Sequence, residues 1–425
     1  MFKFDYDSYN SCSSDPSQFM REIILISFLG QDQPNQFTRL MQVLSVHSLQ
    51  ILDVGQAVIH NQLTLGIVVS SDDQTATALA MKEILILAHD IGLTVRFKPI
   101  STTEYDQWVS EGGQTRYIVT ALAPELTASQ LQAVTKIVSN QGFNIETVTR
   151  LSGRPDLNNQ TDGPKRSCVQ FGLKGQMLDA IAMRAACLRL STELNVDVAV
   201  QEDNAFRRNS RLVCFDMDST LIEQEVIDEL AIEAGVGEQV AEITERAMQG
   251  ELDFQQSFRA RVALLKGMDA SVLPKIAERL TVTEGAERLI STLKALGYKT
   301  AILSGGFQYF AEYLQAKLGI DEVHANFLDV QDGRVTGEVK GHIVDGARKA
   351  LLLRELADNM GISLEQTIAV GDGANDLPML SIAGLGVAFR AKPLVRQNAN
   401  QAISSVGLDG VLYLLGVHDK DLNRA

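Results

Sequence analysis

Cysteine is scarce in this chain of 425 residues, which contains only four. They are Cys12, Cys168, Cys187 and Cys214, and no two of them form a CxxC pair. Disulfide-rich domains contain many cysteines, and structural zinc sites contain closely spaced ones such as CxxC pairs. The spacing therefore predicts free thiols in a reducing compartment.

Long apolar runs are missing as well. No segment approaches the roughly 20 apolar residues that a membrane-spanning helix needs. The N-terminal MFKFDYDSYN has acidic and polar residues where a signal peptide would be basic and then apolar. We therefore expect a cytoplasmic protein with no membrane partner.

Positive charge is in short supply. The 38 Lys and Arg residues are outnumbered by 53 Asp and Glu residues, so the formal net charge is −15. A chain of this sign repels polyanions at long range and lacks a basic stripe for nucleic acid. We expect no nucleic-acid partner.

The composition that remains, 45% hydrophobic and 21% charged, is typical of globular proteins. At roughly 100 to 200 residues per domain, the length allows two to four domains. Residues 20–100 contain apolar runs in the order β-α-β-β-α-β, and residues 115–203 repeat this order. In the first unit we expect strands at 23–28, 49–58, 63–69 and 94–99, with helices near 37–44 and 75–91. In the second we expect strands at 116–122, 144–151, 167–173 and 197–201, with helices at 127–141 and 176–194.

A third unit, residues 211–421, follows a boundary segment without apolar periodicity at 202–210. Short β-rich runs alternate here with helical runs, which predicts an α/β fold with a doubly wound parallel sheet. A helical insert at about 225–280 follows the first strand and is expected to cap the carboxyl edge of the sheet. Strands are expected at 211–215, 300–303, 367–371 and 386–389, and helices at 284–296, 310–318 and 346–360.

The clearest chemical signal is Asp216 and Asp218, two carboxylates that follow the first strand of this unit. Residues two apart on an extended chain point to the same side, and parallel sheets place their ligands at this edge. Two acids so close repel each other unless a cation or a proton lies between them. Taken alone, an Asp-x-Asp pair is more often an acidic turn that caps a helix.

Three further segments favour a site over such a turn. Ser304 and Gly305 end a second strand, where backbone N–H groups can approach an anion closely. Asp372, Asn375 and Asp376 follow a third strand in the glycine-rich GDGAND. Between these segments Lys349 lies early in a helix, although a lone lysine is usually a solvated charge.

These four segments, in this order, resemble the motifs of the haloacid dehalogenase superfamily, and within it those of the phosphoserine phosphatases. The resemblance covers about half of the chain. The resemblance to the phosphoserine phosphatases in particular rests on further residues: Glu225, Met248-Gln249-Gly250, Phe254, Arg261 and Thr283-Glu284-Gly285. This resemblance implies hydrolysis of O-phospho-L-serine to L-serine and phosphate, the last step of serine biosynthesis.

The resemblance also implies roles for the acids. Asp216 is the expected nucleophile, which forms an aspartyl-phosphate, and Asp218 the expected acid and base. Mg²⁺ is the expected cofactor, held by Asp216, Asp372 and the backbone carbonyl of Asp218, with Asp376 supporting from behind. The phosphate is expected to meet Lys349, Ser304, Gly305 and Asn375.

For the amino-acid part of the substrate, Glu225 is expected to bind the ammonium and Arg261 the carboxylate. Met248 and Phe254 are expected to exclude water from the pocket. The alternatives remain open: Arg261 could pair with a nearby acid such as Asp253, and the two apolar residues could simply be the core of the cap.

The two β-α-β-β-α-β units resemble ACT domains, which are ferredoxin-like α+β modules that often bind amino acids. Residues 30–35 (GQDQPN) resemble the ligand loop of such a module, whereas the second unit has Leu122-Ala123-Pro124-Glu125 at that place. An amino-acid effector and a homodimer are the expected partners, and dimerisation or packing alone is the alternative for both units.

Three functions are compared. The first is a phosphoserine phosphatase, the second a phosphatase or phosphotransferase of the same superfamily for another small phosphate ester, and the third a catalytically idle amino-acid sensor. The complete set of acids argues against the sensor. A panel of phosphate esters would separate the first two.

Overall fold

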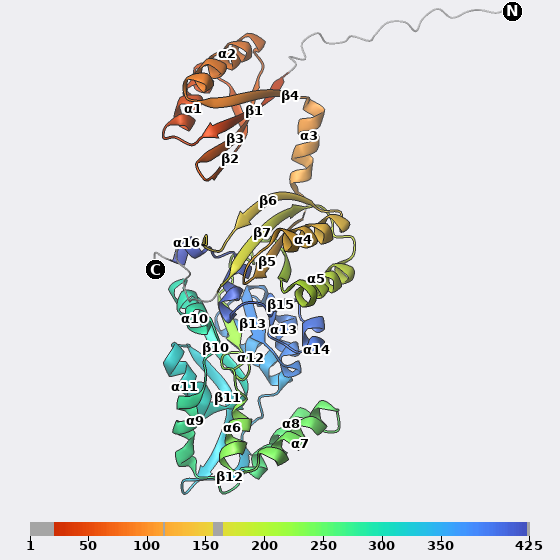
Figure 1. Ribbon diagram of the computed structural model, residues 1–425, viewed down its shortest axis with the longest axis vertical. Helices are drawn as coiled ribbons and strands as arrows, with labels where there is room; N and C mark the ends of the chain where they lie inside the picture. Colours follow the sequence, from red (N-terminus) through yellow and green to blue (C-terminus); the bar gives the residue numbers. More distant parts are fainter. Residues whose placement is uncertain (1–20, 114, 156–164, 423–425) are drawn as a thin grey trace, which may run out of the picture. The chain divides into compact units, whose positions relative to one another are not determined.

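The computed structural model describes residues 21–113, 115–155 and 165–422, apart from the side chain of Met248, and these residues form three β-sheets (Figure 1). The chain divides into two compact units after Gly113. Residue 20, where the first domain is expected to begin, and Cys12 lie outside the described residues.

The first unit contains the predicted β-α-β-β-α-β order. Its elements are β1 (Glu22–Gln31), α1 (Gln36–Val46), β2 (Gln50–Ile59), β3 (Gln62–Ser71), α2 (Gln74–Asp90) and β4 (Leu93–Ile100). The four strands are antiparallel and lie in the order β2-β3-β1-β4. Ile24, Ile26 and Phe28 of β1 are buried in one cluster with Leu40 of α1 and Ile84 of α2, because alternate side chains of a strand share one face.

A short helix that the sequence pattern did not predict follows this sheet. It is α3 (Thr102–Ser110), continued by η1 (Glu111–Gly113). The Ser101 side chain accepts the N–H of Glu104 at 3.2 Å, and the Glu104 carboxylate accepts the N–H of Ser101 at 2.9 Å. This reciprocal cap stabilises the start of α3, but α3 buries no residue, so it has no apolar periodicity to detect.

The second unit begins with the same order of elements. They are β5 (Arg116–Ala123), α4 (Ala128–Asn140), β6 (Asn144–Arg150), β7 (Ser167–Lys174), α5 (Ala180–Leu194) and β8 (Asp197–Glu202). The strands lie in the order β6-β7-β5-β8, so each occupies the place of its counterpart in the first sheet. The predicted repeat of element order is confirmed.

The seven-stranded sheet has the order β12-β11-β10-β9-β13-β14-β15, and all neighbours are parallel except β11 and β12. Its strands are β9 (Leu212–Phe215), β10 (Lys299–Phe307), β11 (Glu322–Gln331), β12 (Arg334–Lys340), β13 (Thr367–Gly371), β14 (Leu385–Phe389) and β15 (Gln401–Ile403). The four predicted strands are present. Three more were not predicted, including the β11–β12 hairpin, which turns at Asp332 and Gly333 with φ of 47° and 74°.

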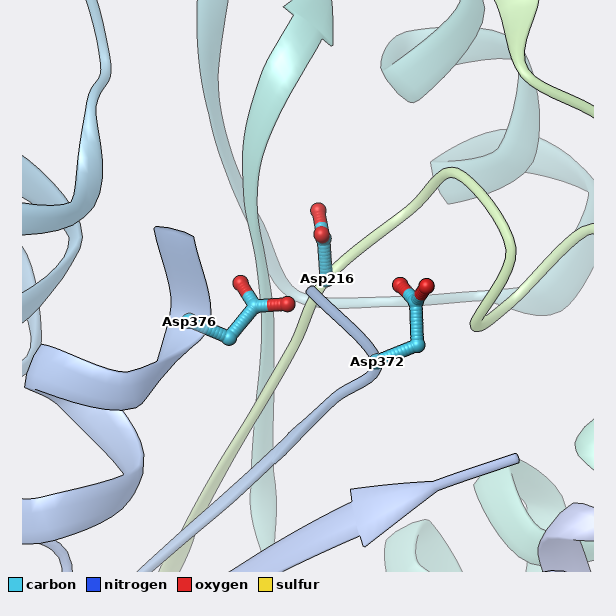
Figure 2. Close-up of side chains that lie close together, drawn as sticks. All are labelled: Asp216, Asp372 and Asp376. Carbon is cyan, nitrogen blue, oxygen red and sulfur yellow. The ribbon is translucent and has the colours of Figure 1, made fainter. Parts of the chain in front are cut away.

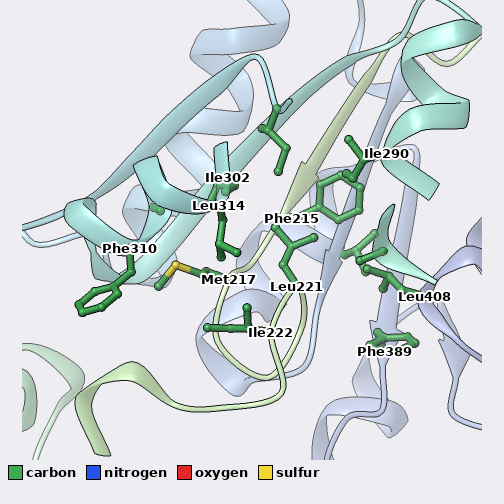
Figure 3. Close-up of a cluster of buried hydrophobic side chains, with 14 of the residues drawn as sticks. Phe215, Met217, Leu221, Ile222, Ile290, Ile302, Phe310, Leu314, Phe389 and Leu408 are labelled. Carbon is green, nitrogen blue, oxygen red and sulfur yellow. The ribbon is translucent and has the colours of Figure 1, made fainter. Parts of the chain in front are cut away.

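Helices cover both faces of this sheet. Val213 and Phe215 of β9 belong to one buried apolar cluster, which Figure 3 shows, while Leu212 and Cys214 belong to a second cluster on the other face. This alternation confirms the doubly wound arrangement, in which the central strands are buried on both faces. The helices are α10 (Ala286–Ala295), α11 (Gln308–Leu318), α12 (Gly346–Asn359), η3 (Leu364–Gln366), η4 (Ala374–Asp376), α13 (Leu377–Ile382), α14 (Pro393–Asn398), η5 (Leu408–Gly410), α15 (Val411–Leu414) and α16 (Asp419–Leu422).

The insert after β9 is helical, as predicted. It contains α6 (Val226–Glu233), α7 (Gly237–Met248), α8 (Phe254–Leu264), η2 (Ala270–Val272) and α9 (Leu273–Arg279). The segments by which the chain enters and leaves the insert pair with each other through an antiparallel bridge between Ile222 and Val282. The N–H of Thr283 also donates to the carbonyl of Leu221 at 2.9 Å. The insert therefore leaves the sheet and returns to it at one point.

The second four-stranded sheet packs against the seven-stranded part with the face that its own helices leave free. Leu122, Cys168 and Ala199 lie in the same apolar cluster as Val213 and Phe215. The two parts thus share one core.

Polar contacts at this junction centre on Asp197, which is 1% exposed. Its carboxylate accepts the N–H groups of Ser404 and Ser405, each at 2.7 Å, and the Ser191 hydroxyl at 2.8 Å. A buried carboxylate needs such donors to offset the loss of water.

Among the described residues, no helix is long and apolar enough to cross a membrane. Cys168, Cys187 and Cys214 are buried free thiols, as predicted.

Candidate active site

Asp216 directly follows β9, the central strand of the seven. Its N–H donates to Val370 of the neighbouring β13 at 2.9 Å, which continues the sheet pattern to the first acid. The chain then turns sharply, because Ser219 adopts a left-handed conformation with φ of 57°. The turn leaves Asp216 buried at the carboxyl edge, with 5% of its surface exposed.

Two acids from the loop after β13 converge on Asp216 (Figure 2). One carboxylate oxygen each from Asp216, Asp372 and Asp376 lies within 4.8 Å of the others. Segments separated by more than 150 residues therefore form one acidic cluster, as the order of the strands predicts.

Lys349 of α12 lies beside this cluster and is fully buried. Its ammonium is 2.8 Å from Asp216 and 2.7 Å from Asp376. The close start of α12 depends on Gly346, since a Cβ there would lie 2.6 Å from the carbonyl oxygen of Asn375. The lysine is thus a part of the site and not a solvated charge.

The cluster carries more negative than positive charge, and the pKa values respond. Burial, followed by the nearby Asp376, raises the pKa of Asp216 well above its usual range. Burial and the same neighbour raise the pKa of Asp372 to about 7. Burial lowers the pKa of Lys349, but Asp216 and Asp376 outweigh it, so the net shift is upward and the ammonium stays charged.

Asp218 lies next to this cluster under the start of the insert. Its carboxylate accepts the N–H of Val226 at 3.2 Å. Burial and the charge of Glu225 raise its pKa well above the usual range. Gly306 has no room for a side chain, because a Cβ there would lie 2.5 Å from Asp218 and 3.1 Å from the Ser304 hydroxyl.

Ser304 and Gly305 lie at the carboxyl end of β10. The Ser304 hydroxyl accepts the N–H of Gly306 at 2.9 Å, so its own proton is free to be donated elsewhere. Asn326 of β11 donates to the carbonyl of Gly305 at 2.8 Å and accepts the N–H of Val344 at 2.7 Å. Asn326 thereby holds two loops of the site together.

The insert contacts this edge through α8, as predicted for a cap. A Cβ at Gly305 would lie 2.8 Å from the ring of Phe254. That ring stacks on Phe258, with 6.0 Å between centroids, and Phe258 lies 5.6 Å from Phe307. Phe254 therefore belongs to an aromatic row and also covers the site. The side chain of Met248 lies outside the described residues.

Arg261 lies on the same helix and is partly buried. Within the described residues its Nε is buried without a hydrogen-bond partner, and no carboxylate lies within ion-pair distance. Burial lowers its pKa, while Glu225 and Asp228 act in the opposite direction. The alternative partner Asp253 instead caps α8, accepting the N–H of Gln256 at 2.8 Å.

Glu225 is exposed at the start of α6, where it accepts the Ser219 hydroxyl at 2.8 Å. Asn375 is half-buried in the same loop as Asp372. Sequence reasoning missed Thr220, whose hydroxyl donates to Asp372 at 3.4 Å, and Asn326. Thr220 lies two residues after Asp218, in the same segment as the two acids (DMDST, residues 216–220), and could have been found there, whereas no motif surrounds Asn326.

The donor set fits a hard divalent cation, since carboxylate oxygens of Asp216 and Asp372 face one another in a site with excess negative charge. Asp376 has both of its oxygens occupied, one by Lys349 and the other by the N–H of Gly373 at 2.9 Å. It is therefore placed to hold its neighbours and not to bind a cation directly.

The chain matches two known families. Residues 213–381 match the haloacid dehalogenase-like hydrolases, and residues 22–98 match the ACT domain.

Two relatives match nearly the whole length of the chain. A phosphoserine phosphatase of Streptomyces coelicolor is 40% identical over 95% of this chain and 94% of its own. One of Mycobacterium tuberculosis is 40% identical over 95% of both chains. In structure, a probable phosphoserine phosphatase of Vibrio cholerae has a TM-score of 0.57 at 36% identity, covering 74% of this chain and 90% of its own. With the acidic cluster and Lys349 in place, these matches show that the chain is an enzyme that belongs to the phosphoserine phosphatase family of haloacid dehalogenase-like hydrolases.

Proposed function

We propose that this enzyme hydrolyses O-phospho-L-serine to L-serine and phosphate. The observation that carries the proposal is Arg261, a partly buried side chain whose Nε has no hydrogen-bond partner among the described residues. It lies on the same cap helix as Phe254, whose ring covers Gly305. A substrate carboxylate would supply the missing partner. The chain is 40% identical to a phosphoserine phosphatase over 95% of its length, which supports the same substrate.

Asp216 is the proposed nucleophile. Its carboxylate attacks phosphorus, the bond from phosphorus to the serine oxygen breaks, and an aspartyl-phosphate forms. In the second step a water molecule attacks this phosphorus and the Asp216 carboxylate leaves. Two easier displacements thus replace one difficult hydrolysis.

Asp218 is the proposed acid and base. It gives its proton to the serine oxygen in the first step and takes a proton from the attacking water in the second. The raised pKa of Asp218 supports this role, because the group must be protonated when the substrate binds.

Family members are generally metal-dependent, and we propose Mg²⁺ for this chain, held by Asp216, Asp372 and the backbone carbonyl of Asp218. When bound, the cation would neutralise the carboxylates and polarise the phosphate oxygens. Asp376 orients Lys349, and the lysine supplies a fixed positive charge beside Asp216.

The remaining phosphate contacts are assigned to the strand ends. The Ser304 hydroxyl, with its proton free, and the Gly305 N–H donate to the phosphate, and Asn375 and Lys349 assist. On the cap side Glu225 binds the ammonium and Arg261 the carboxylate, while Phe254 and Met248 exclude water.

Steady-state kinetics of the purified full chain test the proposal. Phosphoserine should be turned over faster than phosphothreonine or a sugar phosphate, and EDTA should abolish turnover until Mg²⁺ is restored. Asp216→Asn should remove activity and the acid-stable phosphorylated protein. Asp332→Asn changes an exposed aspartate in the β11–β12 turn and serves as the control. A sugar phosphate preferred over phosphoserine would favour the alternative, another phosphatase or phosphotransferase of the superfamily.

We also propose the wider assignments that the sequence predicts. Residues 20–100, 115–203 and 211–421 are taken as domains, and the product places the enzyme at the last step of serine biosynthesis in the cytoplasm. The ACT match at 22–98 supports an amino-acid effector and a homodimer. Packing alone also accounts for the glycine at position 30 of the loop, since a Cβ there would lie 2.6 Å from Leu93. Gly30 is therefore no separate evidence for an effector.

A further inference from the structure

A pocket of about 690 Å³ lies within the second unit, where the second four-stranded sheet meets the edge of the seven-stranded sheet. One wall comes from α5, β8 and the segment after β8, and the other from α14, β15 and the start of β14. None of the carboxylates of the candidate active site lines it. It is therefore a separate cavity, of a volume typical of small-molecule sites.

The pocket contains cationic groups without full partners. Arg207 lines it with a side chain that is only 6% exposed; its Nη1 lies 3.9 Å from Asp203 and its Nε donates to Gln201 at 3.5 Å. Within the described part of the chain, Nη2 of Arg207 and Nε of Arg396 are buried without a hydrogen-bond partner. Two glutamates, Glu202 and Glu365, also line the pocket, but both are exposed.

A buried guanidinium nitrogen without an acceptor is unfavourable, because burial removes its water without supplying a partner. Burial lowers the pKa of Arg207 for the same reason. A carboxylate matches a guanidinium in both charge and fork geometry, so it is the acceptor that satisfies these nitrogens best.

The remaining walls are largely apolar. Ile181 and Leu188 of α5 and Phe206 after β8 line the same cavity. Ile181 and Phe206 are 83% and 44% exposed, so apolar surface at this pocket is left in contact with water. An apolar group of a bound ligand would cover that surface.

We propose that this pocket binds a small organic carboxylate with an apolar side group, whose acid group pairs with the two arginines that line it, Arg207 and Arg396. The ligand bridges two parts of the enzyme that already touch here. Arg184 donates to Asn400 at 2.9 Å, and Arg396 donates to Ser191 at 2.9 Å. Because the ligand adds contacts to both walls, its binding raises the thermal midpoint of the whole second unit.

Calorimetry on the full chain tests the proposal with 3-methylbutanoate and phenylacetate as probes. The matching amides have the same shape without the charge and serve as ligand controls. Both carboxylates should bind, each at least about tenfold more tightly than its amide. No heat up to about 10 mM carboxylate, or equal binding of the amide, would overturn the proposal and leave a water-filled cavity.

Variants locate the site. Arg207→Met and Arg396→Met should each weaken carboxylate binding by about tenfold or more, whereas Arg208→Met, at the exposed neighbouring position, should leave it unchanged. Arg261→Met should also leave it unchanged, since Arg261 belongs to the candidate active site. Binding that depends on Arg261 and not on Arg207 or Arg396 would overturn the assignment. Circular dichroism checks folding, and Arg396→Met decides alone if Arg207→Met does not fold.

Discussion

Lys349 and Asp376 form an ion pair of 2.7 Å between two side chains that are both fully excluded from water. The same ammonium contacts Asp216 at 2.8 Å, so one lysine holds the proposed nucleophile and the loop after β13 in place. Removing one member of such a pair leaves an uncompensated buried charge.

Lys349→Met should therefore lower the free energy of unfolding by about 3 to 5 kcal/mol, in addition to abolishing activity. Urea denaturation measures the change. The double variant Lys349→Met with Asp376→Leu should recover part of the stability and none of the activity, because it removes one of the two carboxylates left without their cation but does not restore the ammonium beside Asp216. Equal stability of wild type and Lys349→Met would contradict the role given to the pair.

Arg261→Ala should separate the two ends of the substrate. We expect kcat/KM for phosphoserine to fall about a hundredfold, since a charged hydrogen bond is lost. An ester without a carboxylate, such as phosphoethanolamine, should lose much less. Equal losses on both esters would remove Arg261 from the substrate pocket.

Asp419 should contribute a pH-dependent part of the stability. Although burial opposes it, hydrogen bonds from the N–H of Gly153 and from Arg288, at 2.7 Å each, hold the pKa of Asp419 below its usual range. The stabilisation is present above the unfolded pKa of about 3.9 and is lost as the pH falls through the lower, folded value. Asp419→Asn should be less stable at neutral pH, and its urea midpoint should fall less steeply in acid than that of wild type.

The shared core predicts how the chain tolerates shortening. A chain that begins at residue 115 keeps Leu122, Cys168 and Ala199 and should unfold in one transition. A chain that begins at residue 204 exposes the surface that these residues cover and should have a thermal midpoint several degrees lower. Calorimetry of the two chains decides the matter, and identical midpoints would show that the junction adds no stability.

The parts of the fold and of the site that could be predicted are marked by patterns within a few neighbouring residues of the sequence. Asp216, Asp218 and the residues from Asp372 to Asp376 follow apolar strands, and parallel strands bring their carboxyl ends together. Element order was enough to place Lys349 with them, although a lone lysine carries no signal of its own.

The parts that were missed depend on contacts between distant segments. Nothing around Asn326 marks it, because its role comes from bonds to Gly305 and Val344. Leu122 and Ala199 look like ordinary strand residues, and only the packing shows that they face a second sheet. The β11–β12 hairpin was missed because an antiparallel edge departs from the βα alternation.

The shared core of the second four-stranded sheet and the seven-stranded sheet also limits how such a chain can evolve or be recombined. The segment that ends at Gly113 forms a compact unit of its own, so we expect that it can be exchanged as a whole between relatives. The second repeat cannot, since a replacement would have to match the Val213 and Phe215 side of the interface and supply an acid in the place of Asp197. Chimeras should therefore succeed with crossovers near residue 113 and fail with crossovers near residue 204.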